Sequence, residues 1–295
     1  MPELVPIALR LLEAKLLVRS WGNLSARLDN EHFKITPSGR SYRKLKESDM
    51  VMVDLAGNYR GSILPSSEKG LHAAIYRAFP EARVIIHTHQ NFASAFSLSG
   101  HDLEIDNSVA GREAAGLVAA NGSQLVPVSS YEPAGTNELD QAALSALKRA
   151  ASRSVLLAGH GAVFWGETAE ACVDLALRLE DYCRATYLAQ GLPLPKEPLL
   201  LEAYQRGLAA YLEDFAQMFG PQLGPEQEPN NGVLAVDKGL VFAGIDQEDA
   251  MNRHDVFLKN FLAAQVAKRA LIAPLAQERA QDLRQNYLDS YSKRY

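Results

Sequence analysis

The chain has 295 residues, of which 47% are hydrophobic and 22% are charged, so it is long enough to bury a substantial core and has the composition of a globular protein. Its net charge is -5 with both signs interspersed, which excludes the basic stripe that phosphate-backbone binding requires and predicts no nucleic-acid partner. Because the apolar runs are short and no signal peptide pattern is present, we expect a cytoplasmic protein with no membrane-spanning segment.

Hydrophobic periodicity predicts alternating helices and short strands along the first two thirds of the chain. Helical spacing is present at residues 4–18, after Ser66 or Ser67 as an N-cap, from about residue 92, at 136–151 and at 168–190. Strands are expected at residues 24–28, 33–36, 51–54, 83–88, 124–128, 154–158 and 162–165. Because hairpins outnumber βαβ crossovers in this order, we predict an α/β fold whose sheet is mixed or mainly antiparallel.

Helix-breaking residues at 191–195 mark a predicted boundary between a domain of residues 1–195 and a C-terminal extension, 196–295, that packs on it. The extension is predicted to contain a helix at 199–219, then a hairpin and a helix from Gln247. This last unit resembles residues 155–166 and the helix after them, and whether it is a true repeat stays open. The C-terminal unit has Lys238 at the position that corresponds to His160. A cationic Lys cannot replace a neutral imidazole as a metal ligand.

Three histidines form a candidate metal site. His87 and His89 follow an apolar strand with one residue between them, so their side chains leave the same face of the strand. His160 stands between two glycines after another apolar strand, where the backbone can approach closely. Three histidines leave a fourth position open for substrate or water, as in a catalytic zinc site. On the pattern alone, a purely structural role for these histidines stays open.

Small polar residues in the first seventy positions form three pairs that could together cradle a phosphate. Each pair supplies backbone N–H groups beside a hydroxyl or an amide, and the last opens a helix, whose dipole favours an anion. Taken singly, each pair is more readily explained as a turn or a cap. The pairs are Gly22-Asn23, Ser38-Gly39 and Ser66-Ser67.

Six motifs in register resemble the class II aldolase/adducin family across roughly residues 5–190. They are Trp21–Arg27, Ile35–Gly39, Ser66–Glu68, His87–His89, Tyr131–Thr136 and His160-Gly161. The resemblance implies an α/β/α sandwich with a central, largely antiparallel sheet, assembled as a homotetramer with sites at subunit interfaces. It also implies that His87, His89 and His160 bind zinc and that Glu68 is the catalytic base. The implied phosphate ligands are Gly22, Asn23, Ser38, Gly39, Ser66 and Ser67.

The resemblance further implies a lyase of carbohydrate metabolism that reversibly cleaves a ketose 1-phosphate to dihydroxyacetone phosphate and an aldehyde through a zinc-bound enediolate. Manganese, cobalt or nickel could replace zinc. Aldolases of the family also use a tyrosine of a neighbouring subunit as an acid, and residues 105–109, where we would expect it, contain none. That departure leaves a decarboxylase or dehydratase of a sugar-derived phosphate as an alternative.

Two other functions are less favoured. Sugar-phosphate 4-epimerases of the family carry Asp where this chain has Glu68, and a non-enzymatic, adducin-like module would be expected to lack the three histidines. For Glu68 itself, the alternative that it only caps its own helix stays open. His72, on the helix after it, is a candidate for orienting a neighbouring residue.

Overall fold

An antiparallel sheet of six strands forms the centre of the computed structural model, which describes residues 2–106, 124–227, 232–236 and 239–291. The strand order is β3-β2-β1-β4-β8-β7, and all neighbours in it are antiparallel. The strands are β1 (Asn23–Arg27), β2 (His32–Ile35), β3 (Val51–Asp54), β4 (Val84–Thr88), β7 (Ser154–Leu157) and β8 (Gly161–Gly166). The prediction of a largely antiparallel sheet is confirmed, and β4, which leads into the histidine pair, is one of its central strands.

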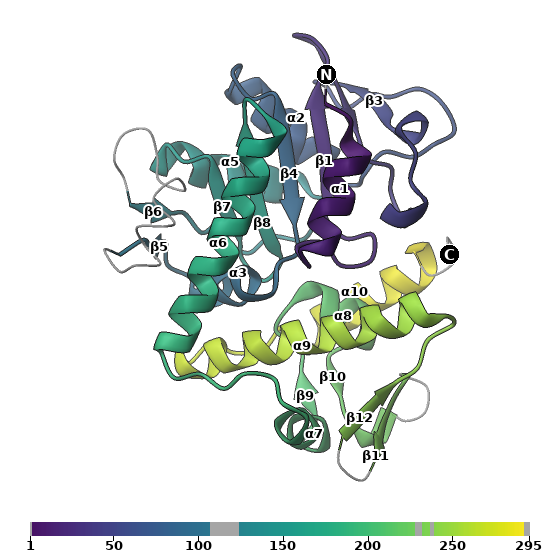
Figure 1. Ribbon diagram of the computed structural model, residues 1–295, viewed down its shortest axis with the longest axis vertical. Coiled ribbons are helices and arrows are strands. Elements are labelled where there is room, and N and C mark those ends of the chain that lie inside the picture. The colour runs from purple at the N-terminus through teal and green to yellow at the C-terminus, as the bar shows by residue number, and fades with distance from the viewer. Residues whose placement is uncertain (1, 107–123, 228–231, 237–238, 292–295) are drawn as a thin grey trace.

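Helices cover both faces of this sheet, which gives the predicted α/β/α sandwich (Figure 1). One face carries α2 (Lys69–Ala78) and α5 (Asn137–Ala150), and the other carries α1 (Leu4–Glu13), α3 (Asn91–Phe96) and α6 (Ala169–Ala189). Successive side chains of β4 alternate between the two cores, since Ile85 belongs to the first and Ile86 to the second. No helix in the described ranges combines the length and apolar character needed to cross a membrane.

The elements after α6 lie together at one end of the sheet (Figure 1). They are α7 (Glu197–Gln205), β9 (Leu208–Ala209), α8 (Glu213–Phe219), β10 (Gln222–Leu223), β11 (Val233–Val236), β12 (Gly239–Phe242), α9 (Gln247–Arg269), α10 (Gln277–Asn286) and a π-helical turn, Tyr287–Tyr291. Helix α9 packs against α3, and one buried hydrophobic cluster contains residues from both parts of the chain. The boundary at residue 195 stays a prediction, and Lys238 lies outside the described residues.

Short elements complete the described chain. Strands β5 (Leu103–Glu104) and β6 (Leu125–Val126) pair with each other, as do β9 with β10 and β11 with β12. The hairpin β11–β12 followed by α9 has the same order as β7–β8 followed by α6, as the sequence predicted. Single 3-10 turns lie at Tyr42–Lys44, Glu47–Asp49, Ser97–Ser99 and Pro225–Gln227.

The predicted helix at residues 199–219 is wrong, because the chain breaks it into two. Helix α7 ends at Gln205, and Gly207 then adopts a φ of 75° before β9 and the start of α8 at Glu213. Glycine adopts this left-handed conformation without the steric penalty of a Cβ, and it commonly ends a helix. The break turns the chain so that α8 approaches the end of the sheet.

The first predicted helix is too long. Helix α1 ends at Glu13, and Lys15 has a φ of 58°, so residues 16–18 continue in irregular backbone. They are nonetheless buried against the core, at 1%, 2% and 5% exposure. The spacing of apolar residues indicates which side chains are buried. Over only three residues, it cannot distinguish a buried loop from a further turn of helix.

One buried carboxyl group lies where α5 packs on α2. Asp140 is 7% exposed, and a Cβ at Gly70 of α2 would collide with its Oδ2. Burial, and after it the charge of Glu68, raises the pKa of Asp140 to about 7. In the unfolded chain this pKa is about 4. The folded state therefore resists ionisation of Asp140, and this group reduces stability as the pH rises from about 4 to about 7.

We expect Asp140→Asn to stabilise the protein at pH 8 by about 1–2 kcal/mol, allowing for solvent screening, and the gain to shrink progressively below pH 7. Urea unfolding between pH 5 and pH 8 measures the effect. Glu138→Gln is the matched control, because Glu138 is in the same helical turn but exposed. A gain that is the same at pH 5 and pH 8, or that Glu138→Gln reproduces, would contradict the assignment.

Candidate active site

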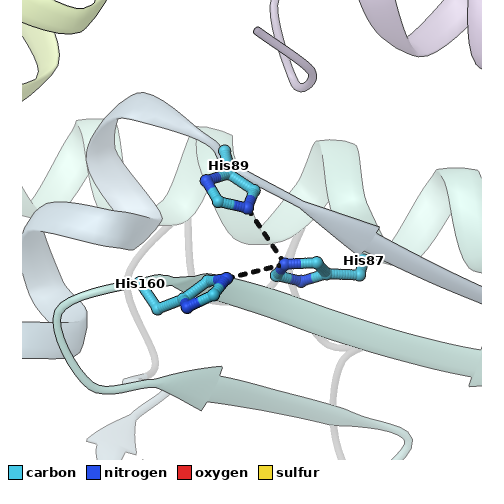
Figure 2. Close-up of side chains that lie close together, drawn as sticks. All are labelled: His87, His89 and His160. Carbon is cyan, nitrogen blue, oxygen red and sulfur yellow. Dashed lines mark hydrogen bonds between the residues drawn. The ribbon is translucent and has the colours of Figure 1, made fainter. Parts of the chain in front are cut away.

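Three buried imidazoles meet at the end of β4 (Figure 2). His87 belongs to β4, His89 follows the strand, and His160 belongs to the turn between β7 and β8. The Nε2 atom of His87 lies 3.0 Å from the Nε2 atoms of both other rings. The structure therefore brings together the three histidines that the sequence singled out.

Two glycines allow this close approach. A Cβ at Gly161 would collide with the Thr88 carbonyl and lie 3.1 Å from Cε1 of His87. Gly22 has a φ of 84°, and a Cβ there would lie 2.6 Å from the His87 carbonyl oxygen. Only glycine fits at these positions, so the Gly-His-Gly turn and the Gly-Asn pair bring β8 and β1 close to β4 at the histidine end.

Two of the three rings, His87 and His89, are held in the neutral form. Nδ1 of His87 lies 2.9 Å from the Ala162 carbonyl oxygen, which only accepts, so Nδ1 donates and the lone pair of Nε2 faces the other rings. Burial lowers the pKa of His87 to about 4 and the pKa of His89 well below its ordinary value. Burial acts in the same direction on His160, but the carboxylates of Glu68 and Glu213 outweigh it and raise the pKa of this ring. Neutral imidazole is the form that binds metals.

The carboxylate of Glu68 faces the same centre. Its Oε2 lies 3.3 Å from Nε2 of His87, and its Oε1 lies 3.4 Å from Nε2 of His160. Oε2 accepts a hydrogen bond of 2.7 Å from Nδ2 of Asn23, whereas Oε1 has no hydrogen-bond partner within the described chain. Burial alone would raise the pKa of Glu68, but His87, His160 and the Asn23 amide hold it below its ordinary value. Glu68 is therefore an ionised carboxylate with one oxygen left for a ligand.

A chain of hydrogen bonds holds Glu68 in this position. Nε2 of His72 lies 2.5 Å from Oδ1 of Asn23, and Oγ of Ser25 lies 2.6 Å from Nδ1 of His72. Burial lowers the pKa of His72 to about 3, so the neutral ring donates from Nε2 and accepts at Nδ1. Ser25 and His72 thereby turn the amide of Asn23 toward Glu68, which is the orienting role anticipated for His72.

The predicted N-cap of α2 is wrong. The N-cap residue is Glu68, not Ser66 or Ser67, and its side chain makes no capping hydrogen bond. The hydroxyl of Ser66 instead accepts a bond of 3.3 Å from the N–H of Glu68. Because the Glu68 carboxylate faces the histidines, the interpretation that it serves only as a helix cap is not supported.

A cavity of about 380 Å³ opens beside this centre, lined by Glu68, His89 and His160. All six residues predicted to bind a phosphate line the same cavity; they are Gly22, Asn23, Ser38, Gly39, Ser66 and Ser67. The expectation that each pair offers free N–H groups is wrong in part, because the N–H groups of Ser38 and Ser66 donate to the carbonyls of Leu64 and Thr36. These two serines can bind a phosphate only through their hydroxyls.

The C-terminal extension lines this cavity too, through residues that the sequence pattern did not single out. Its contributions are Gln217, Arg279, Leu283, Asn286 and Tyr287. Two more of its residues stand behind the histidines: Oε2 of Glu213 lies 3.3 Å from Nδ1 of His160, and Oδ2 of Asp214 lies 3.6 Å from Nδ1 of His89. In the sequence this acidic pair stands between two apolar residues, Leu212 and Phe215, and that pattern could have indicated that the carboxylates lie close to the core. The structure shows both apolar residues to be fully buried.

The donor set fits a divalent metal ion. The ligand atoms of His87, His89 and His160 all lie within 4.8 Å of one another. The Nε2 atoms of the three rings converge beside Oε1 of Glu68, which accepts no hydrogen bond in the described ranges, and a cation placed between them could bind all four atoms. Three imidazoles with a fourth position open to water, substrate or a carboxylate are typical of catalytic zinc sites. The histidine cluster can therefore hold a metal ion.

Comparison with known proteins identifies relatives of this chain. A family model described as the Class II Aldolase and Adducin N-terminal domain matches residues 2–187. The 5-methylthioribulose-1-phosphate/5-deoxyribulose-1-phosphate aldolase of Rhodospirillum rubrum is 31% identical over 182 residues, which are 60% of this chain and 77% of that protein. The 3-oxo-tetronate 4-phosphate decarboxylase of Haemophilus influenzae is 29% identical over 170 residues, 58% of this chain and 78% of that protein.

A solved structure shares the fold. It is an L-fuculose 1-phosphate aldolase that superposes with a TM-score of 0.57 at 29% identity, over 66% of this chain and 89% of that one. The family match ends at residue 187, before α7 begins, so α8 and α10 lie outside it. The central sheet, the three histidines and Glu68 all lie within it.

Proposed function

Because the chain belongs to the class II aldolase and adducin family, we propose that it is a zinc-dependent lyase that reversibly cleaves a ketose 1-phosphate to dihydroxyacetone phosphate and an aldehyde. One observation carries the proposal. The ionised carboxylate of Glu68 lies 3.3 Å and 3.4 Å from two nitrogens of the histidine cluster and lines the cavity that the six small polar residues also line. The similarity to an aldolase of phosphorylated pentuloses supports the same substrate class.

The residues then have distinct roles. His87, His89 and His160 would hold the zinc ion, which when bound supplies a Lewis acid for the negative charge that develops on the ketone oxygen. In the condensation direction Glu68 takes a proton from the carbon next to the carbonyl. In cleavage the ionised Glu68 takes the proton of the C4 hydroxyl, the bond between C3 and C4 breaks to give the aldehyde, and Glu68 then returns that proton to C3. Asn23 orients the carboxylate for both transfers through its 2.7 Å hydrogen bond.

The substrate phosphate would lie among the six small polar residues. Ser38 and Ser66 would donate from their hydroxyls, and the N-terminus of α2, directly after Glu68, adds a dipole that favours an anion. Hydrogen bonds to a charged group contribute about 1.5–3 kcal/mol each. Two or three such hydrogen bonds would therefore make a phosphorylated substrate bind much more tightly than its unphosphorylated analogue.

A decarboxylase of a sugar-derived keto-acid phosphate is the second candidate, because one relative of similar identity is a decarboxylase of a phosphorylated oxo acid. The same residues would serve, since loss of carbon dioxide leaves a carbanion next to the carbonyl, and Glu68 can pass a proton from water to that carbon. Of the segment where a tyrosine acid was sought, Ile105 and Asp106 are described, and residues 107–109 lie outside the described part of the chain.

A substrate panel tests the proposal. We expect the zinc-loaded protein to release dihydroxyacetone phosphate from at least one ketose 1-phosphate, with kcat/KM at least about a hundredfold higher than for the free ketose because of the lost phosphate contacts. The panel includes keto-acid phosphates, with carbon dioxide as the readout. Release of carbon dioxide alone would select the decarboxylase, and equal turnover of the phosphorylated and free sugars would count against the phosphate site.

A further inference from the structure

We propose that Glu213 and Asp214, at the start of α8, are positioning residues that orient His160 and His89 for metal binding. The inference rests on the proposed function in one respect, namely that the three histidines hold a metal ion. It adds that two of the three ligands are oriented by the C-terminal extension, which lies outside the part of the chain that matches the family.

Each of the three rings has an oxygen acceptor behind it. Nδ1 of His87 faces the Ala162 carbonyl at 2.9 Å, Nδ1 of His160 faces Oε2 of Glu213 at 3.3 Å, and Nδ1 of His89 faces Oδ2 of Asp214 at 3.6 Å. A histidine that donates from Nδ1 presents the lone pair of Nε2, and an acceptor at Nδ1 both fixes the ring and makes it a better ligand. One ring is therefore oriented by the sheet and two by α8.

Each of the two ring nitrogens faces a carboxylate oxygen, and Oδ2 of Asp214 also forms an ion pair with Lys259. The two carboxylate contacts have ion-pair distances without completed hydrogen-bond geometry, and the four atoms involved make no hydrogen bond elsewhere in the described ranges. A carboxylate oxygen only accepts, so a ring nitrogen beside it is favourable only when that nitrogen carries the proton. Both carboxylates therefore favour the tautomer in which Nδ1 carries the proton and Nε2 has a free lone pair. The Nε2 atoms of the three rings point toward one another (Figure 2).

Other residues hold the two carboxylates in place. Oε1 of Glu213 accepts hydrogen bonds from the Tyr131 hydroxyl at 2.7 Å and from Arg279 at 3.2 Å. Asp214 forms an ion pair with the fully buried Lys259, which also donates to the backbone carbonyl of His89 at 3.4 Å. Oε2 of Glu213 is therefore left to face His160. Oδ1 of Asp214 accepts a hydrogen bond of 2.9 Å from the N–H of Phe215, and its Oδ2 lies between Lys259 and Nδ1 of His89.

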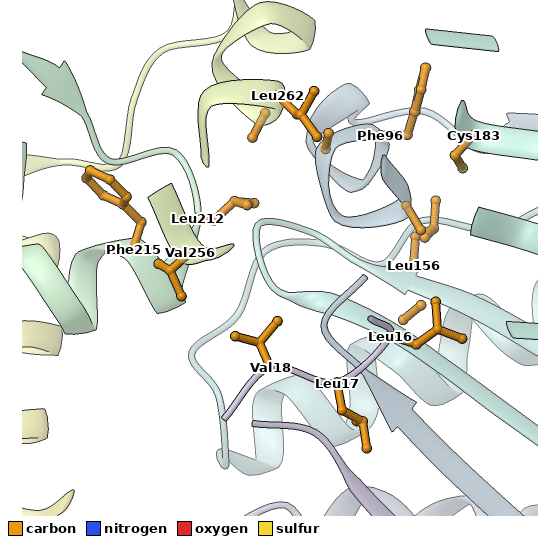
Figure 3. Packing of buried hydrophobic residues seen from close by; sticks show 14 of the residues in the cluster. Leu16, Leu17, Val18, Phe96, Leu156, Cys183, Leu212, Phe215, Val256 and Leu262 are labelled. Carbon is orange, nitrogen blue, oxygen red and sulfur yellow. The ribbon is translucent and has the colours of Figure 1, made fainter. Parts of the chain in front are cut away.

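Packing fixes α8 against the turn that carries His160. The N–H of Glu213 donates to the Gly159 carbonyl at 3.0 Å, which ties the start of α8 to the residue before His160. Leu212 and Phe215, on either side of the acidic pair, belong to the same buried cluster as Val256 of α9 and Leu156 of β7 (Figure 3). The acidic pair therefore rests on a rigid part of the fold, as a positioning role requires.

Zinc affinity tests the inference without relying on catalysis. We expect Glu213→Gln and Asp214→Asn each to raise the zinc Kd roughly tenfold to a hundredfold, the usual effect of removing a partner of a metal-bound histidine. Competition with a chromophoric chelator gives the Kd. The visible spectrum of the cobalt-loaded protein reports the ligand geometry, and we expect it to change in both variants.

Asp249→Asn is the matched control, because Asp249 is another buried carboxylate of the extension but pairs with Arg253 at 3.1 Å, not with a histidine. We expect it to lower stability and leave the zinc Kd unchanged. If Asp214→Asn does not fold because Lys259 loses its counter-charge, the double variant Asp214→Asn with Lys259→Met removes both buried charges.

The outcomes separate this inference from the proposed function. Wild-type zinc affinity in the folded variants of Glu213 and Asp214 would overturn the positioning role and leave the metal site intact. An equal loss of affinity in Asp249→Asn would overturn it as well, because the effect would then be general loosening of the extension. Absence of zinc binding by the wild-type protein would overturn the proposed metal site and this role with it.

Discussion

Replacing Glu68 with Gln is expected to lower kcat by roughly a hundredfold to ten-thousandfold, the usual range for a lost general base. The substitution keeps the size of the side chain, and its amide oxygen can still accept the 2.7 Å hydrogen bond from Asn23. An amide oxygen, however, cannot take a proton from carbon. Because the Glu68 side chain makes no capping hydrogen bond to α2, we expect the fold to remain, and most of the zinc remains on the three histidines.

Steady-state kinetics on zinc-loaded samples, with metal content and thermal unfolding measured in parallel, tests this expectation. Glu180→Gln is a suitable control, since Glu180 is a partly buried acidic residue of α6 that accepts hydrogen bonds from the N–H groups of Phe92 and Ala93 at the start of α3 and does not line the cavity. Its substitution should affect stability more than turnover. Near-normal kcat in a folded, zinc-loaded Glu68→Gln protein would show that Glu68 is not the base.

The double substitution His87→Ala and His89→Ala is expected to abolish zinc binding and to lower turnover by roughly a thousandfold or more. It removes two of the three imidazoles, and the remaining His160 cannot hold the ion alone. Lewis-acid stabilisation of the developing charge lowers the activation free energy by several kcal/mol. Each 1.4 kcal/mol of activation free energy changes the rate about tenfold, so the loss of the metal ion is expected to slow turnover strongly. Stability is also expected to fall, because His87 is fully buried and bonded to Ala162.

His254→Ala controls for nonspecific loss of metal. His254 lies on α9, and the histidine cluster of the described chain does not include it. Its variant should keep both the zinc and the activity of the wild-type protein. The comparison separates loss of ligands from loss of histidine in general.

Much of the central sheet could be predicted from local sequence pattern. The apolar run Val84–Ile86 predicts a strand, and the structure places its residues in two separate cores, one on each face of the sheet. The same period predicts that His87 and His89 leave one face, and the Gly-His-Gly turn brings His160 to them. Information within a few residues was sufficient for these elements.

Long-range contacts could not be read in this way. The helical spacing of residues 199–219 is continuous in the sequence, but Gly207 interrupts it, and the following turn brings Glu213 and Asp214 to the histidines. The periodicity of apolar residues indicates which side chains are buried. It does not indicate which other residues those side chains contact. The backbone N–H groups of Ser38 and Ser66 are a similar case, because their partners come from distant turns.

The most direct test of the central claim measures zinc content and ketose 1-phosphate cleavage in the same samples of wild-type protein and of the His87→Ala, His89→Ala variant. We expect about one zinc per chain and measurable release of dihydroxyacetone phosphate for the wild type, and neither for the variant. Equal zinc content and equal cleavage in the two proteins would contradict it.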